Sequence, residues 1–166
     1  MIASCKPGML RLFAILPALP VTVAAQAGPD RSEVETQILA VVDASLERIS
    51  EEDFEGLAGL LAEGAIVAGV REGRPPSVRT RAEEAATRTD ADLVERGFDA
   101  DVRISGPVAM AWVPYDFYRD GTWSHCGVDV YSIARIEGAW KIVSIVYSVE
   151  QPPACRRHPD GPPGGG

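Results

Sequence analysis

Three side chains that can transfer protons lie in the apolar, strand-like sequence between residues 112 and 149, namely Tyr115, His125 and Asp129. Histidine and aspartate are common general acids and bases, and a tyrosine hydroxyl can polarise a carbonyl group. His125 and Asp129 are four residues apart, which separates them by about 13 Å along a strand. We therefore predict that they act on a small ligand from two sides, His125 as acid or base and Asp129 as base or hydrogen-bond acceptor. Tyr115 is the third candidate catalytic residue.

Five aromatic side chains are candidates for the wall of a ligand pocket around these groups: Trp112, Tyr115, Phe117, Tyr131 and Trp140. Alternate residues of a strand face opposite sides of a sheet, so membership of the pocket depends on register. A three-residue loop at 119–121 would place Tyr115 opposite His125, whereas a two-residue turn would shift the pairing by one residue. A proline within the first strand indicates a bulge or an edge, which leaves both registers open. The structural alternative pairs Asp129 with Arg135 and puts the aromatic residues in a core or a dimer interface.

Cys126 and Cys155 are predicted to form a disulfide bond. If 137–138 is a two-residue turn, counting outward along its two strands puts Cys126 opposite Val149, only six residues before Cys155. Two prolines in between would end the strand and let the chain fold back over the end of the sheet. The alternative is a reactive thiol at Cys126, next to His125. One histidine and one cysteine are too few for zinc, so no metal site is predicted.

Residues 1–27 have the three parts of a secretory signal peptide. Lys6 and Arg11 give a positive start, an apolar stretch follows, and Ala25-Gln26-Ala27 fits a cleavage site. We therefore expect the exported protein to begin at Gly28 and to be periplasmic or secreted. A disulfide bond can persist in those compartments.

The chain is acidic, which argues against nucleic acid and, after removal of the signal, against a membrane as partners. Its 166 residues have a net charge of −8, and loss of the signal would leave 139 residues with a net charge of −10. We predict one domain at 28–150 and a flexible Pro/Gly-rich tail at 151–166, which cannot bury much apart from any tether at Cys155. The sequence has no Gly-rich phosphate loop and no serine nucleophile elbow, and we predict no cofactor.

Helices are predicted first and a meander of strands afterwards, which is typical of an α+β fold. The predicted helices are residues 32–49, 50–64 and 80–97, the last behind a capping box formed by Thr80 and Glu83. A short strand at 65–70 precedes a loop at 71–79. The predicted meander comprises residues 98–104, 108–118, 123–135 and 140–149.

This order of elements resembles the nuclear transport factor 2-like superfamily, in particular its SnoaL-like and uncharacterised exported bacterial members. The resemblance covers about residues 33–149, and its most specific pieces are Gly106-Pro-Val-Ala109 and Gly138-Ala-Trp140-Lys-Ile142. It implies a cone of three N-terminal helices packed on a curved, mostly antiparallel sheet, with a pocket between the two. It narrows the fold more than the function, because the superfamily contains enzymes, ligand binders and interaction modules.

We predict an exported domain that binds a small apolar or carbonyl-containing organic molecule in an apolar conical pocket. The first alternative is a cofactor-independent lyase, isomerase or hydrolase that uses Asp129 and His125, as the resemblance implies. The second is a non-catalytic interaction module that forms a homodimer through the outer face of its sheet. A pocket of at least about 300 Å³ with converging polar groups would favour the first two. A cone filled by aromatic side chains would favour the third.

Overall fold

The computed structural model describes residues 30–164, so the predicted signal peptide at 1–27 lies outside the described residues. Within them the chain forms three helices and seven strands, and the predicted α+β fold is confirmed. The helices are α1 (Arg31–Ser50), α2 (Phe54–Leu60) and α3 (Arg81–Ala85). The strands are β1 (Leu61–Val70), β2 (Ser77–Thr80), β3 (Leu93–Gly97), β4 (Asp101–Ser105), β5 (Val108–Arg119), β6 (Thr122–Ile136) and β7 (Ala139–Ser148).

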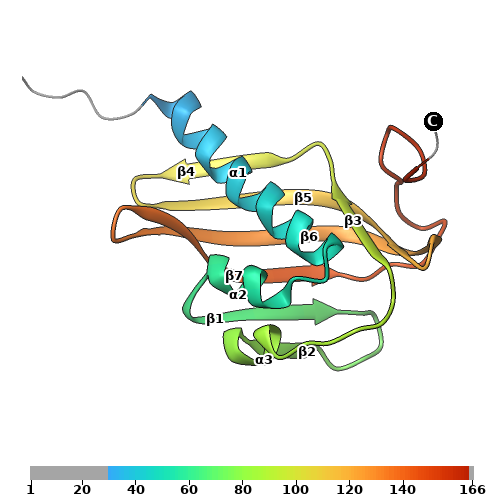
Figure 1. The fold of residues 1–166 in the computed structure, drawn as a ribbon. Coiled ribbons are helices and arrows are strands. Elements are labelled where there is room, and N and C mark those ends of the chain that lie inside the picture. The colour runs from blue at the N-terminus through green and yellow to red at the C-terminus, as the bar shows by residue number, and fades with distance from the viewer. Residues whose placement is uncertain (1–29, 165–166) are drawn as a thin grey trace, which may run out of the picture.

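The seven strands form one curved sheet, and six of them follow the order β2-β1-β7-β6-β5-β3. The seventh, β4, pairs with residues 108–112 of β5, whereas β3 pairs with residues 115–119 of the same strand. All pairings are antiparallel except that of β1 with β7, which is parallel. In Figure 1, α1 crosses one face of this sheet, and α2 and α3 lie on the same side near β1 and β2. The helices and this concave face therefore enclose the interior of the molecule.

The third helix is much shorter than the sequence predicts. The Thr80–Glu83 capping box does form and starts α3, but the helix ends at Ala85. The rest of the predicted helix, residues 80–97, is wrong because 93–97 forms β3, which pairs with β5. This region has only a thin apolar face for a helix to bury, whereas the edge of β5 offers backbone hydrogen bonds to a strand. A side chain at Gly97 would meet Val113 Cγ1 and Leu46 Cδ1 at 2.7 and 2.8 Å, so β3 approaches its neighbours closely.

The register between β5 and β6 differs from both predicted alternatives. The turn at 120–121 has two residues, but Ser124 is an extra residue in β6, so Phe117 pairs with His125. The irregularity therefore lies at Ser124 and not at Pro114. A bulge shifts the pairing by one residue and changes which side chains lie across from each other.

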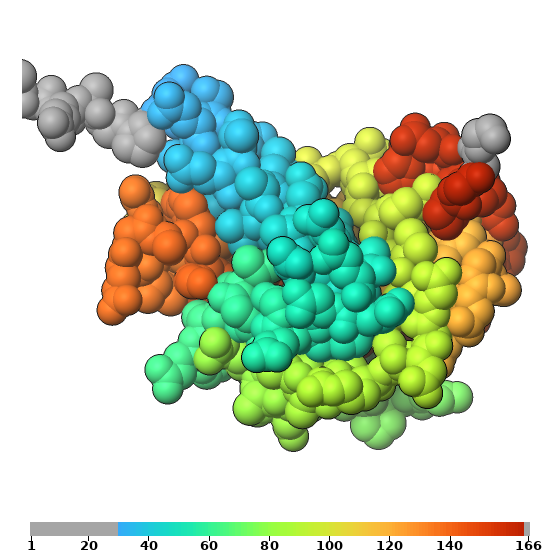
Figure 2. All heavy atoms as spheres, viewed as in Figure 1, coloured from blue at the N-terminus to red at the C-terminus, as the bar shows by residue number. Residues whose placement is uncertain are grey.

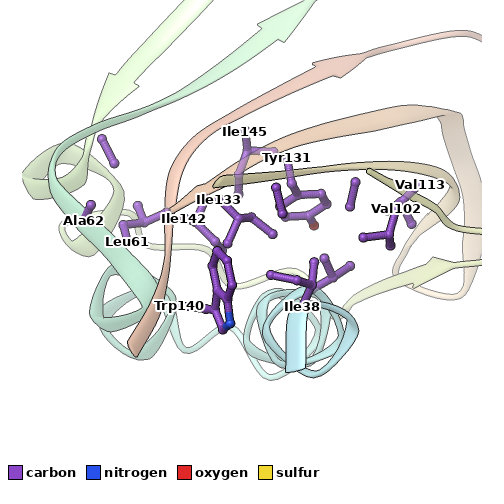
Figure 3. Close-up of a cluster of buried hydrophobic side chains, with 14 of the residues drawn as sticks. Ile38, Leu61, Ala62, Val102, Val113, Tyr131, Ile133, Trp140, Ile142 and Ile145 are labelled. Carbon is purple, nitrogen blue, oxygen red and sulfur yellow. The ribbon is translucent and has the colours of Figure 1, made fainter. Parts of the chain in front are cut away.

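An apolar core fills the end of the cone where α1 crosses the sheet. Figure 3 shows Trp140 and Ile133 extending from the sheet toward Ile38 of α1. Trp140 is buried, and its Nε1 donates a hydrogen bond to Gln37 Oε1 at 3.1 Å. Such large buried side chains each stabilise the fold by about 2–3 kcal/mol. Trp140 is therefore a core residue in this structure, and its predicted place in a pocket wall is wrong.

The structure joins Cys126 and Cys155 as a disulfide, with 5.9 Å between their Cα atoms. Arg135 pairs with Trp140 as the predicted turn requires. An irregularity further along the β6–β7 pair shifts the register by one residue, so Cys126 lies opposite Glu150 rather than Val149.

The tail makes more contacts than the sequence predicts. His158 donates its backbone N–H to the buried carboxylate of Asp116 at 3.0 Å, and the Arg96 guanidinium donates to the Gly161 carbonyl at 2.7 Å. The guanidinium of Arg157 lies 4.0 Å from the centre of the Trp123 ring. In Figures 1 and 2 this red segment lies beside β3. The tether at Cys155 is therefore joined by hydrogen bonds between charged groups of the sheet and the backbone of the tail.

Candidate functional site

A cavity of about 410 Å³ opens between the concave face of the sheet and the side of the cone formed by α2, α3 and β3. Its apolar wall is formed by Ile49, Phe54, Leu57, Val67, Leu93, Phe117 and Ile145. Its polar groups are Arg79, Glu84, Glu95, Tyr115, His125, Asp129, Tyr131 and Tyr147, with Thr87, Arg88, Thr89 and Arg119 also lining it. A mainly apolar wall with a few converging polar groups is the usual composition of a small-molecule site.

The three residues predicted to carry chemistry, Tyr115, His125 and Asp129, all line this cavity, as do two predicted wall residues, Phe117 and Tyr131. Because Ser124 is an extra residue in β6, the odd-numbered residues of β6 pair with the odd-numbered residues of β5. Tyr115, His125 and Asp129 therefore lie on the same, concave face of the sheet. Trp112 does not line the cavity. Its side chain points to the opposite face of β5 from that of Tyr115 and is 48% exposed on the outer face of the sheet. The predicted place of Trp112 in the pocket wall is therefore wrong.

Asp129 is the most unusual polar group of the cavity. Its side chain is only 3% exposed, and its Oδ2 has no hydrogen-bond partner within residues 30–164. Burial disfavours the charged carboxylate and raises the pKa of Asp129 to about 8. The carboxyl group is therefore held mostly in its neutral form at neutral pH. The predicted structural pairing of Asp129 with Arg135 does not occur, because Arg135 is exposed and its Nε donates to the Gly138 carbonyl.

Glu95 on β3 is a second acidic group of the cavity, and the sequence analysis missed it. Burial raises its pKa well above the usual range, and the nearby carboxyl groups of Asp129 and Glu84 raise it further. Its backbone carbonyl and N–H are both bonded to the Ser50 hydroxyl, at 3.3 and 2.9 Å, which fixes β3 against the end of α1. No periodic pattern in Leu93-Val-Glu-Arg-Gly97 marks this segment as a strand, so the sequence offers no clear signal for Glu95.

The hydroxyl hydrogens of the two deepest tyrosines are already used within the protein. Tyr115 donates to the Ser148 carbonyl at 2.7 Å. The Ser45 hydroxyl donates to the Val42 carbonyl at 2.7 Å, so the 3.0 Å contact between Ser45 Oγ and the Tyr131 hydroxyl must have Tyr131 as donor. Burial raises the pKa of both tyrosines, which keeps them protonated. Each can therefore offer a ligand only an oxygen lone pair.

His125 is an aromatic wall residue and is neutral at neutral pH. Its ring stacks on Phe117 with 4.6 Å between the ring centres and meets Tyr115 edge-on at 5.8 Å. Its Nδ1 lies 3.1 Å from Ser124 Oγ. Burial, with a smaller contribution from the charge of Arg71, lowers the pKa of His125 to about 4. This environment disfavours the imidazolium form that a histidine needs to act as a general acid.

Arg79 and Glu84 form an ion pair in the cavity wall. The Arg79 Nε donates to Glu84 Oε2 at 2.6 Å, and the Glu84 carboxylate is almost completely buried. The positive charge of Arg79 and the negative charge of Glu84 therefore neutralise each other. Among the described residues no group of histidine, cysteine and acidic side chains is arranged to hold a metal ion. None of the helices in residues 30–164 is long and apolar enough to cross a membrane.

Comparison with known proteins identifies the fold. No family model matches the chain, and no curated protein matches it. Many solved structures match it. One is a nuclear transport factor 2-like candidate dehydratase from Streptomyces avermitilis, which has 22% identity and a TM-score of 0.57, and the match covers 72% of this chain and 97% of that one. The β subunit of a candidate aromatic-ring-hydroxylating dioxygenase from Novosphingobium aromaticivorans has 12% identity, a TM-score of 0.63, and coverage of 74% and 93%.

A nuclear transport factor 2-like protein of unknown function from Silicibacter pomeroyi has 22% identity, a TM-score of 0.55, and coverage of 74% and 100%. At these identities the likeness concerns the fold. The chain has the nuclear transport factor 2-like cone fold, as the sequence predicts.

Proposed function

We propose that this domain binds a small, largely apolar organic molecule in the cavity between its helices and its sheet. The observation that carries the proposal is the buried Asp129 Oδ2, which lines an apolar cavity and has no partner among the described residues. A buried oxygen without a hydrogen bond costs about 1–3 kcal/mol, a cost that a polar group of a ligand would relieve. A cavity of about 410 Å³ lies within the usual range for small-molecule sites.

A pair of space-filling variants tests this function. Val67→Phe adds a ring inside the cavity, whereas Ile66→Phe adds the same ring to the neighbouring position on the outer face. N-phenylnaphthylamine, an apolar probe that fluoresces when shielded from water, should bind wild type and Ile66→Phe with one site per chain. Val67→Phe should weaken its binding by at least about tenfold, since the ring fills the space the probe needs. Equal binding by both variants would place the probe elsewhere and reject the site.

A second candidate function is acid–base catalysis, and the interaction of Asp129 with Glu95 favours it. Two nearby carboxyl groups share a proton more readily than they both ionise, so one can serve as acid while the other serves as base. In a dehydration, the two carboxyl groups would act with a single proton between them: the protonated one would give its proton to the departing hydroxyl group, and the ionised one would take the proton from carbon. A C–O and a C–H bond would break, a C=C bond would form, and water would leave. The Streptomyces avermitilis structure, a candidate dehydratase, is consistent with this chemistry.

We also propose that the protein is exported. The charged start, apolar stretch and Ala25-Gln26-Ala27 site support this, and so does a disulfide that needs an oxidising compartment. N-terminal sequencing of periplasmic or secreted material should then begin at Gly28. Recovery of the soluble protein from the cytoplasm with Met1 still attached would contradict export.

A further inference from the structure

Several oxygen atoms of the cavity are free to accept hydrogen bonds from a ligand. The hydroxyl hydrogens of Tyr115 and Tyr131 are donated to protein oxygens. Asp129 Oδ2 has no partner, and the carboxyl group of Glu95 lies near enough to feel its charge. A ligand that brings donors would satisfy these oxygens, whereas a carbonyl ligand would use only the proton of a neutral carboxyl group.

The acidic groups of the cavity also lack a matching cation. The guanidinium of Arg79 is held by Glu84, whose carboxylate is buried. Arg88 donates to the carbonyls of its own segment, Ala85 and Thr87. The Arg119 side chain is 61% exposed, and Arg71 is also exposed, so water and salt screen both charges. Among the described residues, Asp129 and Glu95 form no ion pair.

We propose that the ligand is a small organic amine, bound as an ammonium ion with its charged head against Asp129 and Glu95 and its apolar body against the aromatic wall. This inference rests on the proposed binding function and narrows its ligand to a cation. The ammonium group carries up to three donors, which suits two carboxyl groups with free acceptor capacity. The faces of Tyr115, Phe117 and Tyr131 would add cation–π attraction in a site shielded from water.

An ammonium ligand should change the ionisation of the cavity. In the empty cavity, burial and mutual repulsion keep Asp129 and Glu95 largely protonated. The other titratable groups that line the cavity are His125, Tyr115, Tyr131 and Tyr147, the Arg79–Glu84 pair, and Arg88 and Arg119, whose positions are given above. Of these, the histidine is neutral and the pair carries no net charge. A cation between the two carboxyl groups would favour their charged forms, so binding should release a proton.

Three probes with one ring system test this inference, namely naphthylmethylamine, naphthylmethanol and acetonaphthone. Titration calorimetry on the full chain near about pH 8 should show the amine binding at least about tenfold more tightly than the alcohol or the ketone. The binding heat should differ between phosphate and Tris buffers, because the released proton is taken up by the buffer. Asp129→Asn and Glu95→Gln should each cut the preference for the amine to about threefold or less.

The two variants test the inference at two positions, and each amide keeps the size of the carboxyl group that it replaces. Tighter binding of the ketone or the alcohol would overturn the amine inference but leave the binding function intact. An amine preference that persists in both variants would also overturn it. If wild type binds none of the three probes, both the inference and the binding function fail.

Discussion

At the scale of single residues, the chemistry of the site depends on which side chains are buried without a partner. The residue types of Tyr115, His125 and Asp129 suggested a shared place at a cavity, but that place depends on a strand register that the sequence left open. Their ionisation was not predictable, because it depends on burial and on Glu95, which comes from another strand. The expected roles therefore shift: Asp129 is suited to hold a proton at neutral pH, whereas His125 is not.

The raised pKa of Asp129 predicts that the protein loses stability as pH rises. The folded state holds this proton up to about pH 8 and the unfolded chain loses it near 3.8, so alkali favours unfolding between these values. His125 acts in the opposite direction between its folded pKa of about 4 and its ordinary value of 6.5. From about pH 6.5 to 8 the ionisation of Asp129 should therefore lower the free energy of unfolding by up to about 1.4 kcal/mol per pH unit, and Glu95, whose pKa is also raised, acts in the same direction.

Urea unfolding at several pH values measures this slope. Asp129→Asn cannot ionise and should show a shallower slope, while Asp101→Asn, a change at an exposed residue of β4, should retain the wild-type slope. Identical slopes in wild type and Asp129→Asn would show that the buried carboxyl group does not titrate as described.

At the scale of elements, the sequence predicts long periodic segments well and short edge segments poorly. The helix at the start and the strands of the meander follow from apolar periodicity. The segment that carries Glu95 was predicted to be helical because a capping box, which does form, precedes it. The segment forms a strand instead, because it pairs with the open edge of β5. Bulges such as that at Ser124 also escape prediction, since nothing in the local sequence marks the extra residue.

The tail is an element whose position depends on the disulfide. Cys155→Ser removes a link with a sequence separation of 29 residues. It should lower the free energy of unfolding by about 3 kcal/mol, mainly by freeing the unfolded chain. The amide hydrogen of His158, which is donated to Asp116, should then exchange faster with solvent, as measured by hydrogen exchange. Unchanged stability and unchanged exchange at His158 would mean that the link does not hold the tail.

At the scale of the whole molecule, the two faces of the sheet have different roles. The concave face surrounds the core and the cavity, whereas the outer face exposes apolar side chains along a row formed by Trp112, Val130 and Val146. We propose that a second copy of the chain covers this row, as the predicted homodimer requires. Such an interface is compatible with ligand binding, because the cavity lies on the other face. Aromatic side chains do not fill the cavity end of the cone, since Trp112 lies on the outer face and Trp140 packs in the core at the other end.

Native mass spectrometry of the exported protein, after incubation with a metabolite extract of its source cells, tests the central claim most directly. It resolves bound small molecules and shows whether the chains are paired. We predict one small-molecule adduct per chain on wild type and on Ile66→Phe, and none on Val67→Phe, whose added ring occupies the cavity. Absence of any adduct on wild type, or the same adducts on Val67→Phe, would contradict the claim that this cavity is a binding site.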